Sequence, residues 1–280
     1  MRIIALAYHS QNINGDQYEN NDHIALREDL SEIRRRKIPL VSLKDLCCNF
    51  QSRASRHDLP EIAVALSCDD GTTLDWEHFS HPHHGQQISF AEILREHMLI
   101  THDERSHLLT SFVIASPTAR KQIDAGCHAG YELSIEKWWK SAAMTGLIAI
   151  ENHSWDHLHP CIDVVSQREN KKGDFSLIDS YDDADKQVRQ AAEYINKALN
   201  TTRHRTSLFA YPFGHFNNYL TDEYLPKYRH QHGMLAAFTT QPEVMTEASN
   251  IFKLPRYVHG EAWTTSNELV KILNQLQKNY

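Results

Sequence analysis

The stretch EIAVALSCDDG, residues 61–71, changes character abruptly at position 69. Residues 61–67 are mostly apolar and β-branched, a pattern typical of a buried parallel strand. Asp69 and Asp70 follow with nothing between them. Two carboxylates in one buried site repel each other unless a cation lies between them. Because parallel sheets carry their sites at the carboxyl ends of the strands, we expect a cation-binding site here.

Short apolar runs alternate with amphipathic runs along the whole chain, which predicts βα units on a mostly parallel sheet. About seven such repeats favour an α/β fold of the barrel type, in one domain spanning residues 1–280. Two connections, 72–88 and 153–181, are long enough to be functional loops. Strands are expected at 2–8, 39–43, 61–67, 110–116, 147–152, 206–211, 234–240 and 251–259. Helices are expected at 21–38, 42–50, 89–99, 134–146, 182–200, 217–232 (broken) and 266–278.

The composition disfavours several classes of partner. The net charge of −7 argues against nucleic acid or an anionic membrane surface as the main partner. No apolar stretch approaches the roughly 18 residues that a membrane span needs. The N-terminal apolar run is too short for a signal peptide, which predicts a cytoplasmic location. No feature of the sequence indicates a protein partner.

The chain contains five cysteines and 19 histidines. The odd number of cysteines and the lack of any CxxC pattern argue against a disulfide framework and against a zinc–thiolate site. We expect reduced, mostly buried thiols. Three of the histidines, His81, His83 and His84, lie together in a long connection, where a solvated cluster is the expected arrangement.

Polar motifs follow three of the expected strands. Asp69, Asp70 and Gly71 follow the strand 61–67, HSWDH (153–157) follows 147–152, and YPFG (211–214) follows 206–210. The carboxyl ends of parallel strands meet on one rim, so these motifs should converge. Two imidazoles and one carboxylate suit one divalent transition metal ion, with zinc first and nickel, cobalt or iron as alternatives. A second carboxylate beside the ion can act as a base.

The stretches ALSCDDG, IENHSWDH and FAYPFG, in this order, resemble the first three motifs of the polysaccharide deacetylases (carbohydrate esterase family 4, the NodB homology domain). The flanking stretches LAYHS, RRRKIPLVSLKDL, LLTSFVIAS and KLPRYV also resemble the family, so the likeness covers roughly residues 3–275. The resemblance implies a distorted (β/α)7 barrel and metal-dependent hydrolysis of N-acetyl groups on a sugar.

The resemblance also implies roles for particular residues. Asp69 resembles the catalytic base. Asp70, His153 and His157 resemble the metal ligands. In the third motif, Tyr211, Pro212 and Phe213 resemble the groove-forming residues, and the backbone N–H of Phe213 is expected to help hold the oxyanion.

The sequence departs from the family pattern at three points, the first being that the Asp-rich fourth motif with its tryptophan is not recognisable. Ala210 stands near the place of the arginine that orients the base, and Arg256 is the candidate to replace it. The late Leu-x-His motif that supplies the general acid is missing. His259 is the first candidate for that acid, with His215 and His9 behind it.

Three further side chains bear on the site. Trp155, between the two ligand histidines, is expected to line the cleft. Trp138 and Trp139 read as helix core. Cys68 is expected to be buried packing rather than a nucleophile.

These features together predict a metal-dependent deacetylase of an N-acetylated carbohydrate. Two alternatives remain open: an amidase of the same fold that acts on a non-sugar C–N bond, and a catalytically inactive carbohydrate-binding barrel. The intact base and ligand set argue against the inactive barrel, whereas the missing arginine and acid motifs argue for it.

Overall fold

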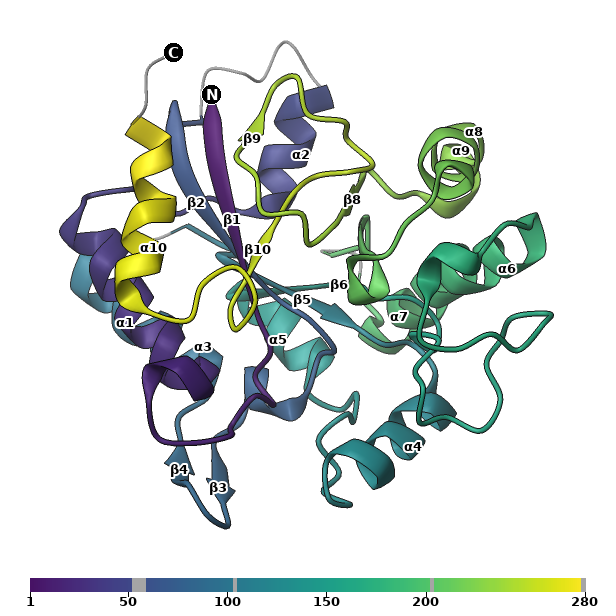
Figure 1. Ribbon diagram of the computed structural model, residues 1–280, viewed down its shortest axis with the longest axis horizontal. Helices are drawn as coiled ribbons and strands as arrows, with labels where there is room; N and C mark the ends of the chain where they lie inside the picture. Colours follow the sequence, from purple (N-terminus) through teal and green to yellow (C-terminus); the bar gives the residue numbers. More distant parts are fainter. Residues whose placement is uncertain (52–58, 103–104, 202–203, 278–280) are drawn as a thin grey trace.

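Seven parallel strands form the central sheet of the computed structural model, which describes residues 1–51, 59–102, 105–201 and 204–277 (Figure 1). In spatial order they are β10 (Tyr257–Val258), β1 (Arg2–Tyr8), β2 (Ile62–Cys68), β5 (Leu109–Val113), β6 (Ile148–Asn152), β7 (Leu208–Ala210) and β8 (Ala236–Phe238). A short strand, β9 (Met245–Thr246), pairs antiparallel with β1. A parallel bridge between Phe238 and Leu254 connects β8 with the segment that leads into β10. The distorted (β/α) barrel expected from the sequence is confirmed.

Helices surround the sheet (Figure 1). They are α1 (Asp22–Arg35), α2 (Leu43–Gln51), α3 (Phe90–Thr101), α4 (Pro117–Cys127), α5 (Trp139–Thr145), α6 (Tyr181–Asp185), α7 (Ala191–Leu199), α8 (Leu225–Lys227), α9 (Arg229–His232) and α10 (Ser266–Leu273). A π-helical turn, Lys186–Gln190, joins α6 to α7, and another, Tyr219–Tyr224, precedes α8. None of the helices in the described ranges is long and apolar enough to cross a membrane.

The structure differs from the sequence-based expectation in several places; the expected helix 134–146, for example, begins only at Trp139. The expected strand 39–43 is reduced to one parallel bridge between Leu40 and Val64. The expected strand 251–259 contributes only the bridge at Leu254 and the two-residue β10, because Pro255 lacks the N–H that a continuous ladder needs. The helix α4 was not expected; Ser116 caps it, accepting a hydrogen bond from the Ala119 amide at 3.2 Å. The long connection 72–88 contains a hairpin of β3 (Phe79–His81) and β4 (Gly85–Gln87).

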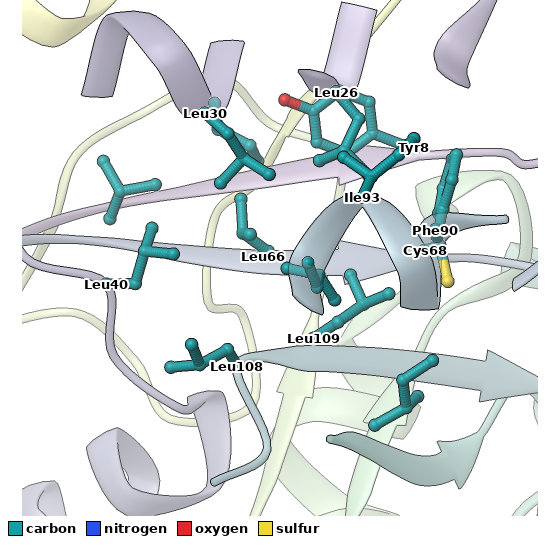
Figure 2. Close-up of a cluster of buried hydrophobic side chains, with 14 of the residues drawn as sticks. Tyr8, Leu26, Leu30, Leu40, Leu66, Cys68, Phe90, Ile93, Leu108 and Leu109 are labelled. Carbon is teal, nitrogen blue, oxygen red and sulfur yellow. The ribbon is translucent and has the colours of Figure 1, made fainter. Parts of the chain in front are cut away.

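The core between the sheet and the helices α1 and α3 fixes the position of strands β1 and β2. The strands β1 and β2 pair in register along their full length, from Arg2 opposite Ile62 to Tyr8 opposite Cys68. Both strands therefore end at the same level. Figure 2 shows Leu26 and Leu30 of α1 and Phe90 and Ile93 of α3 packed over Tyr8, Leu66, Cys68 and Leu109.

The turn that follows β2 requires two residues in the left-handed region. Asp70 has a φ of 71° and Gly71 a φ of 67°. A Cβ on Gly71 would lie 2.4 Å from Cγ1 and 2.9 Å from the backbone Cα of Val113. The glycine therefore lets the turn pass directly over the end of β5, which places both carboxylates at the rim of the barrel.

We predict that Gly71→Ala destabilises the protein more than Gly85→Ala does. Gly85 has nearly the same φ, 65°, but a Cβ there would meet no atom within 4 Å. Both changes carry the left-handed strain of about 1–2 kcal/mol, and Gly71→Ala adds an overpacking cost of about 1–3 kcal/mol. Urea unfolding of the two variants measures the difference. Equal losses would show that the contact with Val113 does not constrain this turn.

Candidate metal and active site

A cavity of about 730 Å³ opens at the carboxyl ends of the parallel strands. Its walls come from six strands that are distant in sequence. The residues that follow the ends of β1, β2, β6, β7, β8 and β10 and line the cavity include His9, Asp69, His153, Phe213, Thr240 and His259. The convergence of the sequence motifs on one rim, expected from the parallel strands, is present in the structure.

Three potential metal ligands face one another in this cavity. Asp70 Oδ1 lies 3.6 Å from His153 Nε2 and 3.6 Å from His157 Nε2. The ligand atoms of the three residues all lie within 4.8 Å of one another. The other ring nitrogen of His153, Nδ1, lies 2.9 Å from the carbonyl oxygen of Ala210. Donation of the Nδ1–H to that carbonyl leaves the Nε2 lone pair free for a metal ion.

The charge states of these residues also suit a metal ion. Burial lowers the pKa of the His157 imidazole to about 3, with a further contribution from neighbouring His153, so the ring of His157 is neutral. Burial raises the pKa of Asp70, but the electrostatic influence of the neighbouring imidazole rings of His157, His9 and His153 outweighs it, and the pKa lies below its usual value. A neutral imidazole and an ionised carboxylate are the forms that bind metal. The donor set therefore fits a divalent transition metal ion.

The backbone between the two histidines folds back on itself to bring both rings to the cavity. Ser154 has a φ of 74° and His157 a φ of 62°. The Asn152 side chain accepts a hydrogen bond from the Ser154 amide at 2.9 Å. The Ser154 hydroxyl in turn accepts one from the His157 amide at 2.9 Å. These bonds offset the cost of left-handed conformations at non-glycine residues.

The π-helical turn between α6 and α7 supports the same segment. Gln187, which is fully buried, accepts a hydrogen bond from the Trp155 amide at 3.0 Å. Its Nε2 donates to Asp156 Oδ1 at 2.8 Å. Such π turns occur often at functional sites, and here the extra residue directs an amide side chain onto the ligand segment.

The second carboxylate, Asp69, is paired with a buried arginine. Arg256 donates from Nη1 to Asp69 Oδ1 at 2.7 Å and from Nη2 to Oδ2 at 2.8 Å. Arg256 is fully buried and Asp69 is 3% exposed. Burial raises the pKa of Asp69, but the charge of Arg256 outweighs it, with contributions from His153 and His9, and holds the pKa well below the usual range. Asp69 is therefore ionised and fixed in orientation.

Two further histidines present unpaired nitrogens near this cavity. His259 Nδ1 lies 2.8 Å from Asp22 Oδ1. His259 Nε2 and His9 Nδ1 are buried and, within the described ranges, have no hydrogen-bond partner. His215 also lines the cavity, with its Nδ1 3.3 Å from the carboxylate of Asp174.

Three residues of the predicted set lie away from the cavity. Tyr211 is fully buried in the core, and its hydroxyl donates to the carbonyl of Phe252 at 2.9 Å. Pro212 is buried beside it. Trp155 packs against Tyr194 and under the ammonium group of Lys186, so its ring covers the helix α7 instead of the cleft. Among the third-motif residues, Phe213 does line the cavity, with its ring centroid 4.4 Å from that of His157.

Several side chains at the site were not anticipated from the sequence. Gln11 donates from Nε2 to Asp70 Oδ2 at 2.5 Å. Asp22 and Gln187 reach the site from α1 and from the π turn, and no local pattern marks either one. His159 lines the cavity two residues beyond the HSWDH motif, and this proximity in sequence was the one available signal.

Comparison with known proteins places this geometry in a family. A family model described as polysaccharide deacetylase matches residues 56–230, which is more than half of the chain. No curated protein sequence is significantly similar to the chain.

Several solved structures share the fold across nearly the whole chain. The deacetylase PplD of Streptococcus pyogenes, solved in complex with acetate, is 16% identical with a TM-score of 0.64, covering 98% of each chain. A de-N-acetylase from Aggregatibacter actinomycetemcomitans is 15% identical with a TM-score of 0.63, covering 97% of this chain and 100% of that one. IcaB from Ammonifex degensii is 19% identical with a TM-score of 0.63, covering 99% of this chain and 97% of that one.

The order of the three motifs, their convergence at the barrel rim and the match of the family model over residues 56–230 lead to one conclusion. The chain belongs to the polysaccharide deacetylase family.

Proposed function

We propose that this protein is a metal-dependent hydrolase that removes N-acetyl groups from an N-acetylated carbohydrate. The observation that carries the proposal is the pairing, in one cavity, of a three-residue metal-ligand set with a second carboxylate held by a buried arginine. Each part has a separate chemical task in amide hydrolysis. The family membership and the shared fold of the deacetylase structures agree with this assignment.

Asp70, His153 and His157 would hold the metal ion. When bound, a divalent ion such as zinc lowers the pKa of a coordinated water and polarises a carbonyl oxygen. The neutral ring of His157 and the ionised Asp70 need no proton change to bind it. Nickel, cobalt and iron also accept this ligand set.

Asp69 would serve as the general base. Its Oδ2 lies 4.0 Å from His153 Nε2, so it borders the ligand set without belonging to it. Arg256 fixes both carboxylate oxygens and takes the role for which the sequence offers no arginine in the third motif. Because its pKa is lowered, Asp69 is ionised throughout the neutral range and is in the form that can accept a proton, while the same lowering weakens it as a base.

His259 would protonate the leaving amine. Its Nδ1 lies 2.8 Å from the Asp22 carboxylate, which fixes the orientation of the ring, and its Nε2 has no partner in the described part of the chain. In this role Nε2 would carry the proton that the leaving amine takes up. His9 is the second candidate, because it lines the same cavity with Nδ1 unpaired.

Phe213 would contribute to the groove and to oxyanion binding. Its φ of 58° turns the backbone of the third motif at the cavity wall, beside His157. One backbone N–H directed at a developing oxyanion is worth about 3 kcal/mol in typical enzymes. The wall also carries Gln11, Asn12 and Glu261, polar groups that suit the hydroxyls of a sugar.

We predict that Asp70→Ala, His153→Ala and His157→Ala each lower the metal content by about one equivalent, because the site offers three protein ligands and no spare one. Elemental analysis of the purified protein measures this, with about one transition-metal equivalent expected at this site in the wild type. His215→Ala is the matched control, since His215 lines the cavity outside the ligand set. A metal content equal to that of the wild type in all three alanine variants would contradict the assignment.

We predict that Asp69→Asn keeps the metal but lowers the rate of deacetylation by about 10²- to 10⁴-fold, the usual contribution of a general base. Acetate release from a short N-acetylglucosamine oligomer measures the rate, and metal analysis of the same sample shows that the ligand set is intact. Turnover at the wild-type rate would show that Asp69 is not the base.

We predict that Arg256→Met lowers stability at pH 7 by about 3–5 kcal/mol, because it leaves a buried carboxylate unpaired. In the wild type the pKa of Asp69 is lowered, so its contribution is complete above about pH 5 and is lost as the pH falls. In the variant, burial raises the pKa of Asp69. Protonation at acid pH therefore removes the cost of the unpaired buried charge. Urea unfolding of metal-free protein measures the free energy of unfolding of both proteins. The difference between wild type and variant should narrow from pH 7 to pH 4.

Arg35→Met is the matched control for this experiment. Arg35 also donates two hydrogen bonds to one carboxylate, Glu32, at 2.7 and 2.6 Å, but its side chain is 66% exposed, so its loss should have little effect on stability. Equal losses of unfolding free energy in the two variants would show that the Asp69–Arg256 pair stabilises the protein no more than an exposed ion pair does.

A further inference from the structure

A second group of potential metal ligands lies beside the cavity, and the proposed reaction does not use it. The ligand atoms of Cys127, His159 and Cys161 all lie within 4.8 Å of one another. Among the described residues, this group and the one containing Asp70 are the two sets of three that meet this criterion. The sequence argued against a thiolate site because it contains no CxxC pattern, yet the fold brings two distant cysteines together.

The group joins two different parts of the barrel. Cys127 is the last residue of α4, which Figure 1 shows at the edge of the fold below α6 and α7. His159 and Cys161 lie in the irregular segment after β6, just beyond the ligand histidine His157. An ion held here would therefore tie α4 to the segment that carries His153 and His157.

The two parts are held together without an ion. Gln122 of α4 accepts a hydrogen bond from the Asp163 amide at 2.9 Å and donates one to Asp163 Oδ2 at 2.9 Å. Gly126 allows the close approach, since a Cβ there would lie 3.2 Å from the Cβ of Cys161. The three ligand side chains are thus brought together by the fold itself, which lowers the ordering cost of binding an ion.

Exposure and chemistry favour an ion that enters from solvent. All five cysteines of the chain are free; Cys127 is exposed, while Cys161 and His159 are half-buried. Two sulfurs and one imidazole are the ligands that zinc and other thiophilic ions prefer. With zinc–sulfur bonds of about 2.3 Å, two sulfurs at tetrahedral positions lie about 3.8 Å apart. That spacing lies below the 4.8 Å within which all the ligand atoms of this group fall.

We propose that Cys127, His159 and Cys161 form a second metal site, which binds one zinc-like thiophilic ion and leaves a fourth position to water. Binding releases the two thiol protons to solvent. Because His159 lines the cavity, with its ring centroid 5.7 Å from that of His157, the ion would also fix one part of the cavity wall. This site does not depend on the proposed hydrolysis.

Cobalt(II) is the probe that separates the two sites, because only a site with sulfur ligands gives thiolate-to-cobalt charge-transfer absorption in the near ultraviolet. Metal-free protein, kept reduced with a phosphine, is titrated with Co²⁺. We expect a charge-transfer band that saturates by two equivalents in the wild type, one equivalent for each site, and by one equivalent in His153→Ala. Cys127→Ser and Cys161→Ser should each remove it. Cys48→Ser, which alters another exposed thiol, and His153→Ala, which alters only the Asp70 site, should keep it.

A reduced wild type with no band, or a band that persists in both cysteine variants, would overturn the proposal. A mass two hydrogens lower in unreduced protein, with no band after reduction, would also overturn it in favour of a disulfide pair. Circular dichroism checks the folding of each variant, and Cys127→Ser, at an exposed helix end, decides the question if Cys161→Ser does not fold. A band in protein that releases no acetate would support this site while the proposed hydrolysis fails.

Discussion

The buried ion pair between Asp69 and Arg256 is the constraint on which the arrangement of the rim depends. A carboxylate this far from solvent is stable only when its charge is matched and both oxygens are hydrogen-bonded. Arg256 meets both needs from the segment that enters β10, while its Nε donates to the carbonyl of Thr239 at the end of β8. One side chain thus links the ends of β2, β8 and β10, where the barrel is least regular.

The ligand segment after β6 depends on a different set of supports. Its left-handed residues, Ser154 and His157, are held by side-chain to backbone hydrogen bonds. Gln187, in the π turn between α6 and α7, forms further hydrogen bonds to the same segment. The position of the two histidines is therefore determined by the packing of a helix that is distant in sequence. Conservative changes in that helix can alter the site without contacting it.

The sequence was sufficient for those features that follow from strand periodicity. Asp69, Asp70, His153 and His157 lie directly after apolar runs, so the expectation that they share one rim needed only parallel strands. The direction of individual side chains could not be predicted from the sequence. The ring of Tyr211 turns into the core and that of Trp155 onto α7, because neighbouring apolar groups offer more burial there than the polar cavity does. The meeting of Cys127 with Cys161 arises from tertiary packing, which leaves no periodic signal.

The origin of the cavity walls has a consequence for how the protein unfolds. The lining runs from His9 to Glu261, so the complete cavity exists only when almost the whole chain is folded. Contacts of such long sequence separation form late and are lost together. A small molecule that binds only the closed cavity would then protect the entire barrel by mass action, strands and helices alike. Loss of binding and loss of fold would coincide in a single cooperative transition.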